Sequence, residues 1–294
     1  MTELFAIAQL AVLGVMIRRA VLEAAQRAWK PERDRLYCRR EGQGPALLFL
    51  HGLAGSWRYW RRGLGGLVRE HALYAPDLLG FGRSPKPRGD YSAAMHAEAV
   101  GRLLQEIGTV EVVVGHSMGA IVALELYARV PERVGQLVLL GLPSFPSRAE
   151  AVATLARGAF LNRAMINGSR VAQAMCYMKD LWALPIFAPI AGVPVDLYRD
   201  YWKHTWMSAS RSLLNTVLAF DAARILERVD RARITLVHGT ADSVSPIEHV
   251  RELATRFPDL ALRELDGDHH LYLTDARAVN RVISERASSR TGER

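Results

Sequence analysis

A serine between two glycines is the first candidate for chemistry in this chain. The segment Gly115-His116-Ser117-Met118-Gly119 directly follows the apolar run VEVVV and precedes the helix-like run AIVALELYARV. This is the context of a nucleophile elbow, in which glycines let a strand and a helix meet in a sharp turn and the helix N-terminus offers its amides to an anion. A plain turn with a capping serine is the alternative. We predict that Ser117 is a nucleophile.

A serine hydroxyl is a weak nucleophile that needs a base, and the base needs an orienting acid. Asp242 closes the segment HGTAD after the apolar run ITLV, and His269 closes DGDH after the run ALREL. The chain order Ser, acid, His is the usual one for a nucleophile elbow on an α/β sheet. The sequence therefore predicts a catalytic triad of Ser117, Asp242 and His269.

Other acids and a second histidine compete for these roles. Asp266 and Asp268 are too close to His269 along the chain to approach its far ring nitrogen easily. Asp77, within DLLGFGRS, is typical of a turn-forming side chain bonded to nearby amides. His270 competes with His269 as the base, and spacing alone does not choose between them.

A tetrahedral oxyanion needs two preset amide donors. Met118, which follows the nucleophile, supplies one, and Leu53 in the loop His51-Gly52-Leu53 is expected to supply the other, with Gly52 letting the backbone turn inward. The residues expected to contact the substrate are His51, Gly52, His116, Trp182, Trp202 and Trp206.

The candidate residues follow short apolar runs of strand length that alternate with helix-like segments. This alternation predicts an α/β fold with a mostly parallel central sheet flanked by helices. In such sheets ligands bind beyond the carboxyl ends of the strands, so the polar residues there should converge on one site. The predicted strands are 46–50, 72–76, 110–114, 136–140, 234–237 and 261–265.

The alternation stops between Pro143 and about Leu226, where the sequence is helix-like and rich in aromatic residues and methionine. We predict that residues 143–226 form an inserted helical cap. The α/β core then consists of residues 31–142 and 227–294, after an N-terminal helical segment of residues 1–30.

The N-terminal segment holds an apolar run, LFAIAQLAVLGVMI, with basic residues after it. The run is shorter than the roughly 20 residues of a bilayer-spanning helix. Glu3 before the run and the positive charge after it make a poor signal peptide. Two alternatives fit, a helix on an anionic membrane surface and a helix packed on the protein body. The expected location is the cytoplasm, with the membrane periphery open.

The composition is that of a globular protein, with 50% hydrophobic and 23% charged residues among 294. The formal charge of +8 raises nucleic acid as a partner, but no zinc spacing, RNP-like stretch or helix-turn-helix pattern accompanies it. Cys38 and Cys176 have no metal-ligand spacing. We expect a small-molecule substrate, no nucleic acid, no metal and no cofactor.

Several motifs together resemble the α/β-hydrolase family from about Arg35 to the C-terminal helix. They are LLFLHGLAGSWRYW, DLLGFGRSPKP, VVVGHSMGAIVAL, LVHGTADSVSP and DGDHHLYLTDARAV. The resemblance implies the α/β-hydrolase fold and a serine esterase or lipase that acts through an acyl-enzyme. Aligned with the family, the last motif makes His269 the base, with Thr274 at a usually acidic position and Ala276 where proline is usual.

The resemblance also limits the reaction. Haloalkane dehalogenases and epoxide hydrolases of this fold use aspartate at the elbow, so Ser117 argues against both. Carbon-carbon bond hydrolases often have a Gly-Pro-Gly type loop, which the segment LAGS at residues 53–56 lacks. They stay an alternative, as do cofactor-free perhydrolases and a non-catalytic ligand-binding member. The apolar N-terminal segment and aromatic cap are similar to monoacylglycerol lipase-like members, which implies an ester with an apolar acyl chain.

Overall fold

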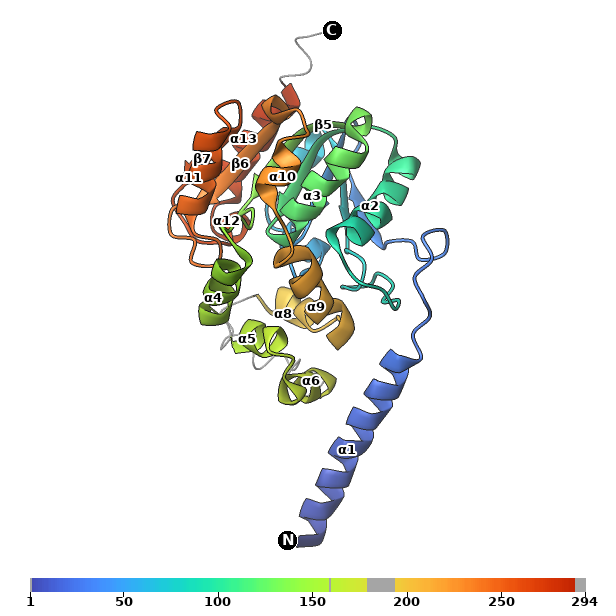
Figure 1. The fold of residues 1–294 in the computed structure, drawn as a ribbon. Helices are drawn as coiled ribbons and strands as arrows, with labels where there is room; N and C mark the ends of the chain where they lie inside the picture. The colour runs from blue at the N-terminus through green and yellow to red at the C-terminus, as the bar shows by residue number, and fades with distance from the viewer. Residues whose placement is uncertain (1, 159, 179–193, 289–294) are drawn as a thin grey trace.

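The computed structural model describes residues 2–158, 160–178 and 194–288. Its centre is a seven-stranded sheet in the order β1-β3-β2-β4-β5-β6-β7 (Figure 1). β1 pairs with β3 in antiparallel fashion, and the other neighbours are parallel. The strands are β1 (Cys38–Glu41), β2 (Ala46–Leu50), β3 (Ala72–Pro76), β4 (Val110–His116), β5 (Val134–Leu140), β6 (Ile234–Gly239) and β7 (Ala261–Leu265). The predicted α/β class with a mostly parallel sheet is confirmed.

The sequence located all six parallel strands. β2, β3 and β7 have the predicted bounds, and β4, β5 and β6 are each two residues longer. β1 was not predicted, because its sequence CRRE lacks an apolar run. It lies at the edge of the sheet, where side chains need not be apolar.

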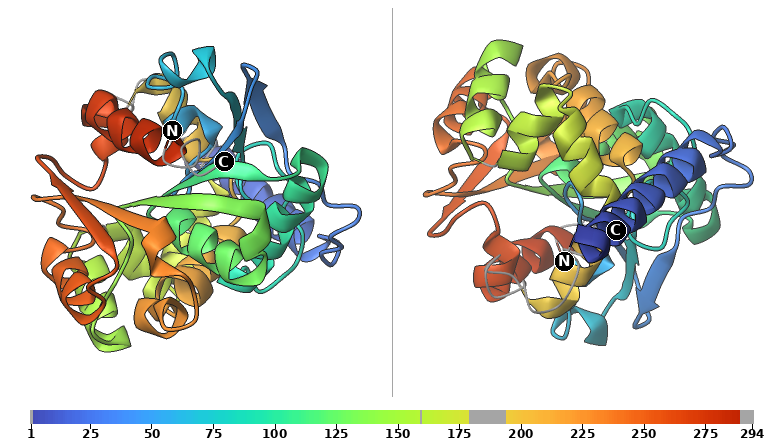
Figure 2. Two further views of the ribbon diagram at one scale, coloured as in Figure 1. Left: turned by 90° about the horizontal axis from the view of Figure 1, so that it is seen from above. Right: turned by 90° about the horizontal axis from the view of Figure 1, so that it is seen from below.

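Each face of the sheet has its own core. Leu48 and Leu50 of β2 pack with the helices of one face, and Leu47 and Phe49 point to the other. Figure 2 shows helices on both sides of the sheet, which explains the near-continuous apolar strands. One face is covered by α2 (Ala93–Ile107), α3 (Met118–Arg129), α10 (Ala222–Leu226) and α11 (Ile247–Arg256), and the other by η1 (Trp57–Tyr59), η2 (Leu67–Arg69), α12 (Leu271–Thr274) and α13 (Ala276–Ser288).

Residues 143–226 connect β5 to β6 and are called the insertion below. Its described part consists of helices and the loops between them. The insertion contacts the loops after β2 and β3, since the Asp200 carboxylate accepts a hydrogen bond from Ser56 and the Ser208 hydroxyl donates to the carbonyl of Gly80. Helices α8 (Val195–Tyr201) and α9 (Trp206–Ser212) of the insertion therefore lie at the carboxyl end of the sheet, whereas α10 packs on one of its faces. The insertion also contains α4 (Arg148–Gly158), α5 (Phe160–Ile166), α6 (Arg170–Tyr177) and η5 (Leu213–Val217).

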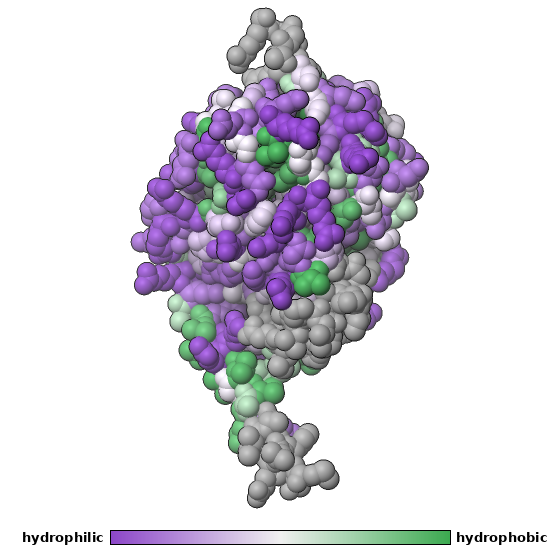
Figure 3. Space-filling model, turned by 180° about the vertical axis from the view of Figure 1, so that it is seen from behind, coloured by the Kyte–Doolittle hydropathy of each residue, from purple (hydrophilic) through white to green (hydrophobic). Residues whose placement is uncertain are grey.

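The N-terminal helix α1 (Thr2–Ala24) projects from the body beside the insertion (Figure 1). Near its C-terminal end, the buried Glu23 carboxylate accepts a hydrogen bond from the amide of Met207 in α9. The apolar side chains further along α1 are exposed and form an apolar surface on the projecting helix (Figure 3); they are Leu10, Val12, Leu13, Val15, Ile17, Val21 and Leu22. The C-terminal turns of α1 contact the insertion, since Leu22 and Glu23 line a cavity together with Tyr177 of α6. Both predicted alternatives, a membrane surface and packing on the protein body, stay predictions. None of the helices that the structure describes is long and apolar enough to cross a bilayer.

Candidate active site

Ser117 occupies a strained turn between β4 and α3. Its φ of 53° lies in the left-handed region, which is uncommon for a residue with a side chain. A Cβ atom at Gly119 would lie 2.2 Å from the Leu50 carbonyl oxygen, and one at Gly115 would lie 2.5 Å from the Gly119 carbonyl oxygen. Only glycine at both flanks lets α3 approach β2 and β4 this closely, as the sequence pattern predicts.

Asp242 and His269 form a buried hydrogen-bonded pair. Asp242 follows β6 and His269 follows β7, and the His269 Nδ1 atom lies 2.7 Å from Asp242 Oδ2. The other carboxylate oxygen accepts hydrogen bonds from the amides of Val244 and Ser245. Because an ionised carboxylate only accepts, Nδ1 of His269 carries the proton and its Nε2 is left as the basic atom.

A third residue, His238 at the end of β6, also contacts Asp242. Its Nε2 donates to the carbonyl of Ser245 at 2.6 Å and lies 3.3 Å from Asp242 Oδ2. Burial disfavours the charged form of Asp242, but hydrogen bonds from His238 and His269 outweigh this effect. They hold the pKa of the carboxyl well below its ordinary value. Asp242 is therefore ionised at neutral pH.

Ser117 lies close to this pair through its neighbour His116. The His116 ring centroid is 4.9 Å from that of His269, and His116 Nε2 donates to the His269 carbonyl at 2.9 Å. The Ser117 hydroxyl itself makes no hydrogen bond to His269 or to any other residue in the described part of the chain. Such bonds are often long before substrate binds. The contact between Ser117 and His269 stays a prediction.

Neither the competing acids nor the second histidine takes part in this pairing. The two carboxylate oxygens of Asp77 accept hydrogen bonds from the amides of Trp57 and Arg83, which is the turn-forming role predicted for it. Asp268 accepts a hydrogen bond from the backbone amide of His270. Asp242 pairs with His269, and no hydrogen bond joins it to His270 among the described residues.

The predicted oxyanion donors belong to two segments next to Ser117, the loop after β2 and the start of α3. A Cβ atom at Gly52 would lie 3.2 Å from Ser117 Cβ, so the loop after β2 runs directly beside the elbow. In the described structure, the amides of Leu53 and Met118 donate to no other protein group. Two unused amides beside a nucleophile are what an oxyanion hole requires. We call residues 51–57 the oxyanion loop below.

The ring nitrogens of His51 are both used within the protein. Its Nε2 accepts a hydrogen bond from the Leu78 amide at 2.8 Å, and its Nδ1 donates to the Gly52 carbonyl at 2.7 Å. Burial lowers the pKa of His51 and keeps the ring neutral. These contacts hold the loop after β2 in place, and the substrate contact predicted for His51 stays a prediction.

His116 is also buried. Its ring stacks on Tyr59 with centroids 4.4 Å apart. Burial, together with the neighbouring His269 and His270, holds the pKa of His116 well below its ordinary value. The substrate contacts predicted for His116 and Gly52 stay predictions.

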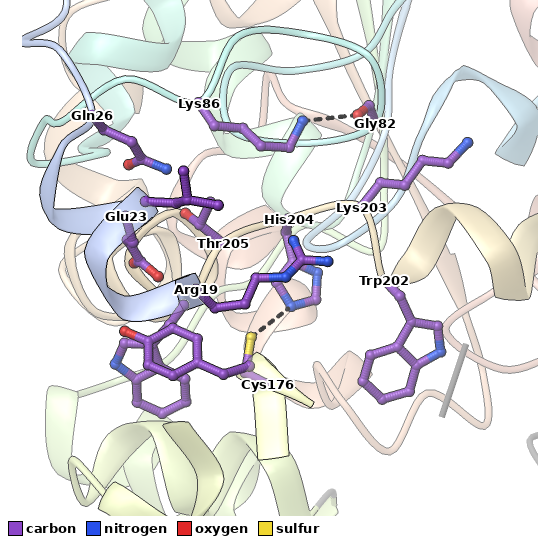
Figure 4. Close-up of a pocket in the computed structure, with 13 residues that line it drawn as sticks. Arg19, Glu23, Gln26, Gly82, Lys86, Cys176, Trp202, Lys203, His204 and Thr205 are labelled. Atoms are coloured by element: carbon purple, nitrogen blue, oxygen red, sulfur yellow. Dashed lines mark hydrogen bonds between the residues drawn. The ribbon is translucent and has the colours of Figure 1, made fainter. Parts of the chain in front are cut away.

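The tryptophans expected to contact substrate lie in the insertion. Trp182 is outside the described residues. Trp202 and Trp206 line a cavity of about 330 Å³ between the insertion, α1 and the loop after β3. In Figure 4, Arg19 and Glu23 of α1 face the segment 202–205 across this cavity. Ser117 and His269 do not line it, so the cavity is separate from the elbow.

Two contributors to the site were not found from the sequence. His238 stands at a strand end four residues before the acid, which is a weak signal. Gly141, with φ 54°, leaves room for the acid and base, since a Cβ there would lie 3.1 Å from His269 Nδ1. Among the described residues, no group of three or more His, Cys, Asp or Glu side chains could hold a metal ion.

The chain belongs to the α/β hydrolase fold family, whose model matches residues 45–276. An esterase of Mycobacterium tuberculosis is 30% identical over 258 residues, which cover 82% of each chain. An uncharacterized protein of the same organism is 29% identical over 265 residues, covering 83% of this chain and 75% of that protein. Among solved structures, an esterase from Exiguobacterium antarcticum superposes with a TM-score of 0.69 at 16% identity and covers 86% of this chain and 95% of its own.

Proposed function

We propose that this protein is a serine hydrolase that cleaves carboxylic esters through a triad of Ser117, His269 and Asp242. The observation that carries the proposal is the buried 2.7 Å hydrogen bond between His269 and Asp242, next to a strained serine elbow. Two unused amides beside the elbow support it. A relative that is 30% identical and named an esterase supports the same class of substrate.

In the proposed cycle, His269 Nε2 removes the proton of the Ser117 hydroxyl while its oxygen attacks the acyl carbon. The amides of Leu53 and Met118 hold the oxyanion, and Asp242 stabilises the imidazolium. His269 then gives its proton to the alkoxide oxygen as the ester bond breaks, which leaves an acyl-enzyme and an alcohol. A water molecule, deprotonated by His269, attacks the acyl carbon, and the acid and free Ser117 are released.

We further propose that the insertion acts as a cap and that the substrate carries an apolar acyl chain. Helices α8 and α9 of the insertion lie at the carboxyl end of the sheet, on the loops beside Ser117. The apolar substrate is suggested by the many aromatic and methionine residues in the sequence of the insertion, although Trp202 and Trp206 line the separate cavity beside α1. Turnover of a panel of esters that differ in acyl length measures which acyl chain the enzyme prefers.

The exposed α1 helix supports a membrane surface as a partner of this hydrolase. Exposed Leu13 and Ile17 present apolar side chains, and Arg18 and Arg19 follow them directly. Apolar side chains insert between lipid tails, and basic residues attract anionic headgroups. We propose that residues 1–30 hold the protein at an anionic bilayer, where apolar esters accumulate.

The test of the triad is Ser117→Ala, assayed on p-nitrophenyl esters of several acyl lengths and with a fluorophosphonate probe. We expect loss of turnover and of labelling, because in the proposed cycle the Ser117 oxygen forms the acyl-enzyme. Ser147→Ala, at an exposed serine of the insertion, is the matched control and should keep both. A wild-type protein with neither labelling nor turnover would favour a binding protein, and turnover by Ser117→Ala would refute the triad.

A further inference from the structure

The buried carboxylate of Asp200 joins the insertion to the oxyanion loop. Asp200 lies on α8, and only 3% of it is exposed. Its Oδ2 accepts hydrogen bonds from the Ser56 hydroxyl at 2.8 Å and from the Arg58 guanidinium. Its Oδ1 accepts one from Lys203 at 2.6 Å. Two cations and a hydroxyl therefore converge on one carboxylate.

Asp200 remains charged in this environment. Burial disfavours the ionised carboxylate, but the hydrogen bonds from Lys203, Ser56 and Arg58 outweigh it and lower the pKa of Asp200. A buried ion pair gains little stability over an apolar replacement, but it fixes geometry because its partners must stay in place. The contact is therefore suited to holding the segment around Ser56 at a fixed position relative to α8.

The part that Asp200 holds is the oxyanion loop. The core holds this loop at two places, through His51 with the Leu78 amide and through the Trp57 amide with Asp77. Leu53 lies between these anchors, three residues before Ser56. The hydrogen bond from Ser56 to Asp200 links this loop to the described part of the insertion.

We infer that Asp200 is a positioning residue that sets the oxyanion loop through Ser56, so that the Leu53 amide points at the developing oxyanion. This inference rests on the proposed function. It makes the insertion part of the catalytic apparatus as well as a cover, because an oxyanion donor is held from the insertion side. Misplacement of such a donor raises the barrier to the chemical step and leaves ground-state binding almost unchanged.

The same helix offers a matched control. Asp196 of α8 also pairs with arginines that follow the oxyanion loop, Arg61 and Arg62, each at 3.7 Å. These arginines are exposed, and Asp196 makes no hydrogen bond to Ser56 among the described residues. Asp196→Asn therefore removes a charge from the same helix without touching the oxyanion loop.

The experiment measures kcat, KM and the Ki of a trifluoromethyl ketone for Asp200→Asn, Ser56→Ala, Ser56→Thr and Asp196→Asn. The ketone adds to the serine and places an oxyanion in the hole. We expect Asp200→Asn to lower kcat about tenfold or more, with KM changed less than about twofold and Ki weakened by the same factor as kcat. Ser56→Ala should change kcat and Ki in the same direction. Ser56→Thr, which keeps the hydroxyl, and Asp196→Asn should stay near wild type.

Equal kinetics for Asp200→Asn and Asp196→Asn would overturn the inference, as would a change in KM alone. If Asp200→Asn does not fold, Ser56→Ala decides, since it leaves both ion pairs intact. Ser117→Ala, assayed in parallel, separates a failure of the proposed serine-hydrolase function from a failure of the role inferred for Asp200. If that variant keeps turnover, the proposed function fails and the inference fails with it. If turnover is lost and Ser56→Ala matches wild type in kcat and Ki, only the role of Asp200 is refuted.

Discussion

Asp242 is the most fully coordinated member of the proposed triad. Its carboxylate accepts hydrogen bonds from two amides, and His238 and His269 lie on its other oxygen. Such an acid has two effects, because it fixes the tautomer of His269 and stabilises the imidazolium that forms during the reaction. The two effects can be tested separately.

The first test is Asp242→Asn. An amide at this position favours the wrong histidine tautomer, so kcat should fall by about 10³- to 10⁴-fold while the protein stays folded. Ester turnover and far-UV circular dichroism measure the two outcomes. Asp268→Asn is the matched control, since the Asp268 carboxylate accepts a hydrogen bond from the backbone amide of His270 and does not hydrogen-bond His269 among the described residues, and it should remain within a few-fold of wild type. Comparable losses in both variants would contradict the assignment.

The second test uses the lowered pKa of Asp242. Because the folded-state pKa lies below the unfolded value of about 3.9, the charged carboxylate stabilises the fold above that value, and this stability is lost as the pH falls towards the folded pKa. At neutral pH the contribution is on the order of 2 kcal/mol. Thermal unfolding from pH 7 to pH 3 should show wild type losing more stability than Asp242→Asn. Parallel curves would show that the Asp242 pKa is not lowered.

At the level of elements, the parallel strands and the elbow could be predicted because their signals are local. An apolar run followed by a polar residue marks the end of each buried strand, and the glycines around Ser117 mark the turn. The polar edge strand β1 has no such signal. The contact between Ser56 and Asp200 joins residues 144 positions apart, so its partners become neighbours only in the folded chain. The same holds for the space that Gly141 leaves for His269.

The elbow predicts an effect on stability. Gly119→Ala would place a methyl group 2.2 Å from the Leu50 carbonyl oxygen, so β2 and α3 must move apart. We expect a loss of about 1–3 kcal/mol in the free energy of unfolding, measured by urea denaturation. Gly65→Ala, where a Cβ would have no neighbour within 4 Å, should change it by less than about 0.5 kcal/mol. Equal stability of the two variants would show that the elbow is not tightly packed.

The projecting α1 helix gives a prediction for the whole molecule. We expect the protein to sediment with vesicles that contain phosphatidylglycerol, more weakly with neutral vesicles, and less at high salt. Leu13→Glu should release it, because a charge on this exposed apolar side chain opposes insertion. Val171→Glu, at an even more exposed apolar residue of α6, should bind like wild type. If both variants bind like wild type, α1 does not hold the protein at the bilayer.

The two edge strands of the central sheet affect whether molecules of this protein aggregate through their strands. An edge strand exposes unpaired backbone groups onto which another chain can add. β1 at one edge carries Arg39 and Arg40, and β7 at the other carries Arg263 and Glu264, with these charged side chains exposed. Bringing a second sheet alongside would bury or oppose these charges. The charged edge strands therefore disfavour strand-to-strand aggregation when molecules are crowded.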